Sequence, residues 1–167
     1  MIETSLPIHI LIRSTSKAGG DWLPFDIGPG YFDIPPGMVA SISIHGIHDE
    51  TIKLLVDELY DVDVIERLDL SENRNIGNEG MRWLVDMRQI SDLNLSACGL
   101  NNRGLDSIIK MKNLRKLDIS YCTRITDTGL KKIKEMRNLE ELYIRGIPRI
   151  THAAIKWLER HDLVIKE

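Results

Sequence analysis

The chain has 167 residues, of which 43% are hydrophobic and 28% are charged. This balance is typical of a folded protein with a sizeable core and argues against wholesale disorder. The formal net charge of −3 argues against a dedicated nucleic-acid binder, which usually carries a marked basic excess. The charge is uneven, because residues 1–89 hold 7 Lys and Arg against 15 Asp and Glu, and residues 90–167 hold 15 against 10.

Residues 1–38 are predicted to form an N-terminal cap. Residues 8–12 (IHILI) favour a strand, and the many Gly and Pro of residues 19–37 indicate turns. The apolar run at 8–12 is too short for a signal-peptide core or a membrane span, and two cysteines make no disulfide framework, so we expect a cytoplasmic protein without membrane contact. Trp22, Phe25, Tyr31 and Phe32 also lie in this segment. They predict an ordered β/loop cap over the open end of a repeat array, or alternatively an exposed aromatic recognition patch.

Residues 39–167 repeat a strand-like and a helix-like stretch about five times. The spacing between successive coils is 24 to 26 residues, and the coils begin at Val39, Ile65, Ile90, Leu114 and Leu139, with a terminal strand from Leu163. The first, fourth and sixth positions of each coil are apolar. Because strand side chains alternate between two faces, these positions should point inward, and the third and fifth should point to the opposite face.

A helix is predicted after each strand, because apolar residues then recur at helical spacing. The expected helix-capping residues are Asp49, Gly77, Asn101, Thr126 and Thr151. One position inside the helices stays small, as Thr51, Gly80, Gly104, Gly129 and Ala154. Glycine inside a helix costs about 1 kcal/mol relative to alanine, so its recurrence predicts that each helix lies tight against a neighbouring coil there.

Cys122 with the turn Ile125-Thr126-Asp127-Thr128-Gly129-Leu130 resembles the cysteine-containing class of leucine-rich repeats. Cys98 with Leu100, Gly104 and Leu105 gives a second match, and Asn73 resembles the asparagine of the broader repeat class. The resemblance implies an α/β, right-handed solenoid with a parallel sheet on its concave side and helices on its convex side. In that class the repeats occur in substrate receptors of ubiquitin ligases and in assembly factors. Residues 1–38 are too short and too rich in Pro and Gly for an F-box, so the ligase role is not implied.

The concave sheet face is the predicted partner-binding surface. Third-position side chains alternate in charge, fifth-position side chains are mostly acids or amides, and two tyrosines and an arginine lie toward the C-terminal end. Tyr and Arg are favoured as interface anchors. The candidate binding residues are Arg67, Asp69, Asp92, Asn94, Lys116, Asp118, Tyr121, Glu141, Tyr143 and Arg145. The alternative is a solvated ladder of charges with no partner.

No catalytic, cofactor or metal site is predicted. Cys98 and Cys122 occupy equivalent positions of adjacent coils, where a disulfide is conceivable, but buried thiols are favoured in a reducing compartment. His45, His48 and Asp49 straddle a turn and should diverge, whereas zinc needs three or four converging ligands. The convex side is basic without interleaved aromatics, which does not favour nucleic acid, through Lys110, Lys112, Arg124, Lys131, Lys132, Lys134 and Arg137.

The sequence therefore predicts a non-enzymatic module, monomeric or weakly self-associating, that binds a protein or peptide through its concave sheet face. The alternative is a structural or assembly scaffold that docks through the exposed sheet edge at Leu163–Lys166.

Overall fold

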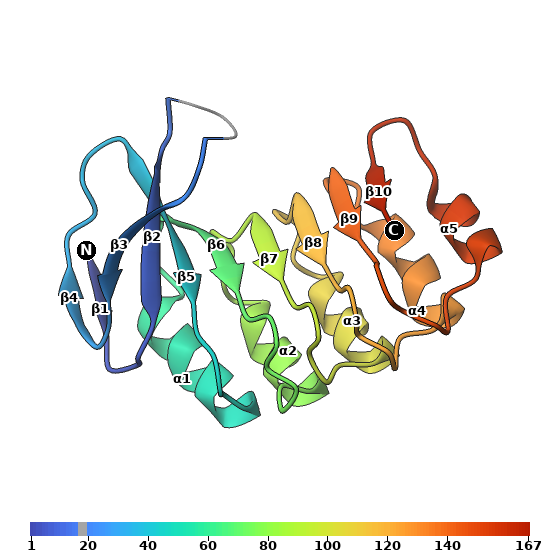
Figure 1. The fold of residues 1–167 in the computed structure, drawn as a ribbon, viewed down its shortest axis with the longest axis horizontal. Coiled ribbons are helices and arrows are strands. Elements are labelled where there is room, and N and C mark those ends of the chain that lie inside the picture. Colours follow the sequence, from blue (N-terminus) through green and yellow to red (C-terminus); the bar gives the residue numbers. More distant parts are fainter. Residues whose placement is uncertain (17–19) are drawn as a thin grey trace.

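The computed structural model describes residues 1–16 and 20–167, and within them the chain forms an eight-stranded sheet with a row of helices along one face (Figure 1). The strand order is β10-β9-β8-β7-β6-β5-β2-β3. These strands are β2 (His9–Ser14), β3 (Leu23–Ile27), β5 (Met38–Ser43), β6 (Ile65–Asp69), β7 (Asp92–Asn94), β8 (Lys116–Asp118), β9 (Glu141–Tyr143) and β10 (Val164–Lys166). Of the described helices, none is long and apolar enough to cross a membrane.

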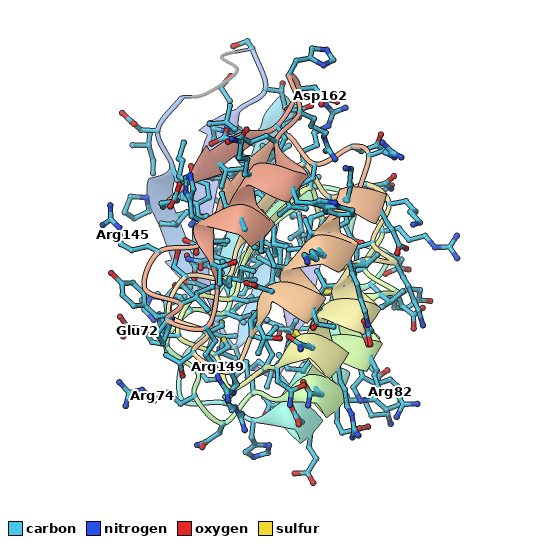
Figure 2. The ribbon with its side chains drawn as sticks, turned by 90° about the vertical axis from the view of Figure 1, so that its right-hand side faces the viewer. Glu72, Arg74, Arg82, Arg145, Arg149 and Asp162 are labelled. Carbon is cyan, nitrogen blue, oxygen red and sulfur yellow. The ribbon has the colours of Figure 1, made fainter. Side chains whose placement is uncertain are left out.

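Each parallel strand from β5 to β9 is joined to the next by a helix. The helices are α1 (Asp49–Leu59), α2 (Asn78–Leu84), α3 (Asn102–Ile108), α4 (Asp127–Lys132) and α5 (His152–Leu158), with a 3₁₀ turn at Ile133–Glu135 after α4. Viewed along the row, the helices stack behind one another beside the sheet (Figure 2). The predicted strand–helix coils are confirmed, because strands β5 to β10 pair in parallel in sequence order.

The core lies between the sheet and the helices. In the fourth coil Leu114, Leu117 and Ile119 are buried, as the first, fourth and sixth positions should be. The second, third and fifth coils repeat this pattern, whereas Val39 of the first coil is only partly buried. Met87, Met111 and Met136 fill the core where the helices end. Burying a leucine-sized side chain stabilises a fold by about 1.5–3 kcal/mol, so these positions hold the coils together.

A side-chain seam joins each helix start to the next coil. The first helical residue of one coil accepts a hydrogen bond from a backbone N–H at the helix start of the next. The bonds run from Gly77 to Asp49, Asn101 to Asn78, Thr126 to Asn102 and Thr151 to Asp127, at 2.7–3.1 Å. The predicted cap at Asp49 is therefore wrong, since His48 takes the cap position of α1.

The seam explains the recurring small residue. A Cβ added at Gly129 would lie 2.3 Å from Oδ1 of Asn102, and one at Gly104 would lie 2.9 Å from Oδ1 of Asn78. The helix is tight against the preceding coil, as predicted, because that coil's Asp or Asn side chain occupies the space.

Buried polar side chains hold the turns that follow the strands. Nδ2 of Asn73 donates to the carbonyls of Ile44 and Leu70, and its Oδ1 accepts from the N–H of Ile47. In the next two coils the thiols of Cys98 and Cys122 each donate to a backbone carbonyl at 3.1 Å. Both thiols are free, and burial raises the pKa of each to about 12, so they stay protonated.

The N-terminal segment adds an antiparallel edge to the sheet. Strand β2 pairs with β5 and β3, while β1 (Ile2–Thr4) pairs with β4 (Gly30–Phe32) beside α1. The carboxylate of Glu58 on α1 holds this piece, accepting from the Thr4 hydroxyl at 2.6 Å and from the Ser5 N–H. Phe32 is buried, but Tyr31 is 71% exposed and so covers no core.

Candidate partner-binding site

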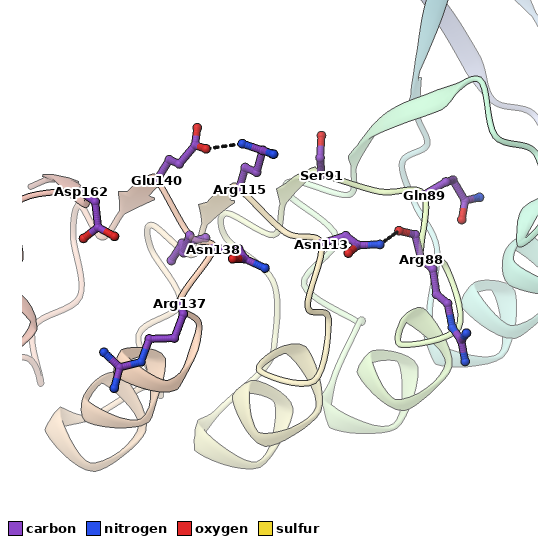
Figure 3. Close-up of a pocket in the computed structure, with 10 residues that line it drawn as sticks. Arg88, Gln89, Ser91, Asn113, Arg115, Arg137, Asn138, Glu140 and Asp162 are labelled. Atoms are coloured by element: carbon purple, nitrogen blue, oxygen red, sulfur yellow. Dashed lines mark hydrogen bonds and ion pairs between the residues drawn. The ribbon is translucent and has the colours of Figure 1, made fainter.

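A hollow of about 570 Å³ lies where the helices return to the strands (Figure 3). Its polar groups already bind one another. The amide of Asn113 donates to the carbonyl of Arg88 at 2.7 Å, and the Arg115 guanidinium pairs with the Glu140 carboxylate. Asn138 repeats the amide bond one coil later, to the carbonyl of Lys112. These contacts fasten neighbouring coils, while the guanidinium groups of Arg88 and Arg137 make no bond among the described residues.

The sheet face, meaning the third- and fifth-position side chains opposite the helices, is in register across the parallel strands. Arg67, Asp92, Lys116 and Glu141 lie directly opposite one another on successive strands. Asp69, Asn94, Asp118 and Tyr143 form a second row. The predicted grouping of these eight residues is confirmed, and they lie about 4.8 Å apart from strand to strand.

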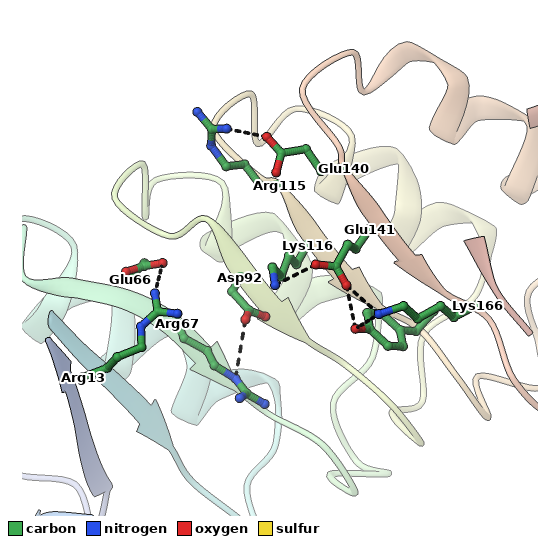
Figure 4. Close-up of polar contacts among 10 residues, drawn as sticks. Arg13, Glu66, Arg67, Asp92, Arg115, Lys116, Glu140, Glu141 and Lys166 are labelled. Carbon is green, nitrogen blue, oxygen red and sulfur yellow. Dashed lines mark hydrogen bonds and ion pairs between the residues drawn. The ribbon is translucent and has the colours of Figure 1, made fainter. Parts of the chain in front are cut away.

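One network occupies the N-terminal half of the sheet face. Arg67 lies 3.9 Å from Asp92 (Figure 4). It also donates to Asp69 at 2.9 Å, and Asn94 donates to Asp69 at 3.1 Å. Burial raises the pKa of Asp92, and the opposing attraction of Arg67 and Lys116 does not cancel this effect. The network is therefore held together at some desolvation cost.

A second network centres on Glu141. Its carboxylate accepts from Lys116 at 2.7 Å, from Lys166 at 2.8 Å and from the Tyr143 hydroxyl at 2.8 Å (Figure 4). The bonds from Lys116, Lys166 and Tyr143 lower the pKa of Glu141 from its usual 4.5 to about 2. They also raise the pKa of Lys116 and of Lys166. Lys166 is the member of this site that the sequence prediction missed, because it belongs to the last strand.

The fifth-position acids and amides also end their strands. Oδ1 of Asp69, Asn94 and Asp118 each accepts the backbone N–H two residues ahead, at 2.8–3.0 Å. Such Asx turns are a common way to stop a strand. These three predicted binding residues therefore have a structural role that the sequence pattern did not reveal.

Tyr121 and Arg145 lie outside the sheet face. Tyr121 follows the end of β8 in a left-handed conformation with φ of 60°, and its ring rests against Gly146. Arg145 is exposed in the turn after β9. Both belong to the turn edge, which we define as the turns between strand and helix at residues 71–76, 96–100, 120–125 and 145–150.

The turn edge is rich in arginine. Its charged residues are Arg74, Arg124, Arg145 and Arg149, with Glu72 as the one acid. Glu72, Arg74 and Arg145 project from the same side of the molecule, opposite Arg82 of α2 (Figure 2). The guanidinium of Arg124 donates to the carbonyl of Gly99, whereas those of Arg74, Arg145 and Arg149 make none of the hydrogen bonds or ion pairs found in residues 1–16 and 20–167. Arg124, predicted on the convex side, lies on the turn edge instead, and no sequence motif distinguishes Arg74 or Arg149.

The strand–helix coils match a known family. The family model of the Leucine Rich repeat matches residues 64–84, which span β6 and α2, and residues 110–134, which span β8 and α4. Two stretches of the chain are thus similar to leucine-rich repeats. No curated protein matches the chain. Within the described part of the chain, no group of three or more His, Cys, Asp or Glu side chains could hold a metal ion.

Proposed function

We propose that the chain is a non-enzymatic interaction module of the cysteine-containing leucine-rich-repeat class, which binds a protein or peptide partner on its sheet face. Leucine-rich-repeat domains generally mediate protein–protein interactions. The observation that carries the proposal is the asymmetry of the sheet. One face packs on the helices, and the other presents two aligned rows of partly exposed polar side chains.

The networks of the sheet face suit recognition because they hold side chains in place before a partner arrives. Lys116 and Glu141 are fixed by each other, so little rotamer freedom is lost on binding. Alternating charges attract a partner whose charges alternate in the complementary order and repel partners with other orders. They therefore contribute specificity more than affinity.

The experiment begins with co-purification of a partner from the source cell and continues with purified proteins. Lys116→Gln removes a central charge, and Asp118→Asn removes a charge while keeping the acceptor for the Ser120 N–H. We expect the double variant to weaken the partner's Kd by about tenfold. The matched control is Lys131→Gln on α4, on the opposite side of the sheet, with Kd changed less than about twofold. If the double variant and the Lys131→Gln control changed the Kd equally, the sheet face would not be the binding surface.

The buried, protonated thiols support a location in a reducing compartment, which we propose to be the cytoplasm. Their high pKa also argues against nucleophilic chemistry at Cys98 or Cys122, since the thiolate is the reactive form.

A structural scaffold that docks through β10 is the second candidate, favoured by Val164, whose side chain is 54% exposed on the last strand of the sheet. Sedimentation of the purified chain over a wide concentration range tests it. A monomer throughout contradicts self-association, and a concentration-dependent dimer that Val164→Lys abolishes supports it.

A further inference from the structure

The turn edge contains a recess at the third coil. The stretch from Ser96 to Asn102, the first residue of α3, is one residue shorter than the stretches from Ser71 to Asn78 and from Ser120 to Asp127. The shortened turn leaves a hollow of about 480 Å³ between its neighbours. It is lined by Arg74, Ala97, Cys98, Gly99, Tyr121, Thr123 and Arg124.

Two sides of the recess, Arg124 and Tyr121, are held by contacts with neighbouring coils. Gly99 forms the floor, and a Cβ added there would lie 2.4 Å from the carbonyl oxygen of Arg74. Arg124 reaches back from the fourth coil to donate to the Gly99 carbonyl. The Tyr121 ring, although its side chain is 52% exposed, cannot fold away, because it already rests on Gly146. The recess is therefore lined by a bonded guanidinium, Arg124, by the Tyr121 ring, and by the exposed Arg74 guanidinium, which has no bond to break when a ligand arrives.

The charge of this region favours an acidic ligand. Its basic groups are all arginines, whereas the nearby helix α4 carries lysines. A guanidinium presents a planar fork that matches a carboxylate in two parallel hydrogen bonds, which a lysine cannot do. Arg145 and Arg149 continue the positive row two coils farther along.

We infer that the turn edge binds an extended acidic segment of the partner, with one Asp or Glu carboxylate in the recess between Arg74 and Arg124 and others at Arg145 and Arg149. The inference rests on the proposed function, since it names the chemistry of the bound protein or peptide. Neighbouring coils are about 4.8 Å apart, so the row spans roughly 14 Å from the second coil to the fifth. An extended peptide covers this distance in about four residue steps and turns every second side chain to the same face. The segment therefore carries acids at alternate positions.

Fluorescence anisotropy at low ionic strength tests the inference with three labelled peptides of about seven residues. The first has Asp or Glu at alternate positions, the second has Asn or Gln there, and the third has phosphoserine in place of the acids. The acidic peptide should bind, and Arg74→Gln should weaken its Kd by about tenfold, with a larger loss when Arg124→Gln is added. Arg82→Gln on α2 is the matched control, since Arg82 is an exposed arginine on the opposite side. It should change Kd less than about twofold.

Equal binding of the acidic and amide peptides, or an equal loss in Arg82→Gln, overturns the inference because either result indicates nonspecific attraction. Binding of the phosphoserine peptide alone also overturns it, since the ligand is then a phosphate. Arg74→Gln removes no internal bond, so a folding defect does not confuse the result, and urea unfolding of each variant verifies this. If the acidic peptide fails while the sheet-face variants still weaken the co-purified partner, the inference falls and the proposed function stands.

Discussion

The sheet face and the turn edge use charge in opposite ways. On the sheet face, Arg67, Lys116 and Glu141 have ion-pair partners at 2.7–3.9 Å. On the turn edge, Arg74 and Arg145 project outward without such partners among the described residues. The cause is geometric. Parallel strands bring equivalent side chains within about 4.8 Å of each other, so opposite charges pair, whereas the turns direct theirs away from one another. A regular alternation of sign therefore indicates internal pairing, whereas Arg74 and Arg145, which lie outside that pattern, are free for a partner.

The strongest test of this contrast uses two consecutive residues of one turn. Asn73 is 2% exposed and fully bonded, and Arg74 beside it is exposed. Asn73→Ala leaves a buried N–H without its partner and removes a donor to two carbonyls, so the free energy of unfolding should fall by about 2–3 kcal/mol. Arg74→Gln should change it by less than about 0.5 kcal/mol. Urea denaturation measures both, and similar losses would show that the turn edge is structural throughout.

The next largest effect on the free energy of unfolding is expected from a substitution in the seam that joins the helix starts. Gly129→Ala gains about 1 kcal/mol of helix propensity, but its Cβ displaces the Asn102 side chain from the Thr126 N–H. We expect a net loss of about 1 kcal/mol in the free energy of unfolding, because the displaced bond and the clash outweigh the propensity.

The control for this seam is Thr51→Ala at the same position of α1, which follows no earlier helical coil and should not destabilise. The double variant Gly129→Ala, Asn102→Ala should lose less than the sum of its parts, as judged by thermal unfolding. Full additivity would show that the two residues do not share the space.

A smaller effect, dependent on pH, is expected at Glu141. Its pKa is lowered to about 2 in the fold, so the bonds to Lys116, Lys166 and Tyr143 contribute stability above pH 4.5 that is lost as pH falls toward 2. Because the group is partly exposed, Glu141→Gln should cost only about 1 kcal/mol at pH 7. The difference from the unaltered protein should disappear near pH 2, and a constant difference across the titration contradicts the network. Glu159→Gln, an exposed acid on the helix side, is the control.

Substitution of Asp92 should have the smallest effect on stability, and its pH dependence should be opposite in sign to that of Glu141. Burial raises its pKa, so the fold disfavours the charged form, and the stability that its protonated form contributes is present at low pH and lost as pH rises. Asp92→Asn should therefore raise the melting temperature slightly at pH 7 and leave it unchanged at low pH. A lower melting temperature at pH 7 would show that attraction to Arg67 outweighs burial.

The sequence pattern predicts the strand–helix coils correctly, because the apolar positions of each coil repeat first with strand alternation and then with helical spacing. It placed Arg67, Asp92, Lys116 and Glu141 in one row correctly, since a period of two determines which face a strand residue occupies. It could not assign Asp49, whose hydrogen-bond partner lies in the next coil, 28 residues away.

Tyr121 is a second residue whose position the sequence pattern does not predict. Nothing in its neighbours requires a left-handed φ, which is uncommon for a residue other than glycine, so the sequence pattern groups Tyr121 with the sheet face although it lies in the turn edge. The recess at Gly99 was also missed, because a deletion of one residue has meaning only when the neighbouring turns lie beside it.

The seam at the helix starts repeats the same kind of junction between successive coils of the array. Each middle coil offers an Asp or Asn oxygen to its successor and keeps a vacant position, usually glycine, for the oxygen of its predecessor. At every junction the donor is a backbone N–H and the acceptor is an Asp or Asn oxygen, so a coil duplicated in register would find both of its neighbours already complementary. Growth or shortening by whole coils can thus preserve the joints, while exposed turn-edge positions such as Arg74, which take no part in them, are free to vary in sequence.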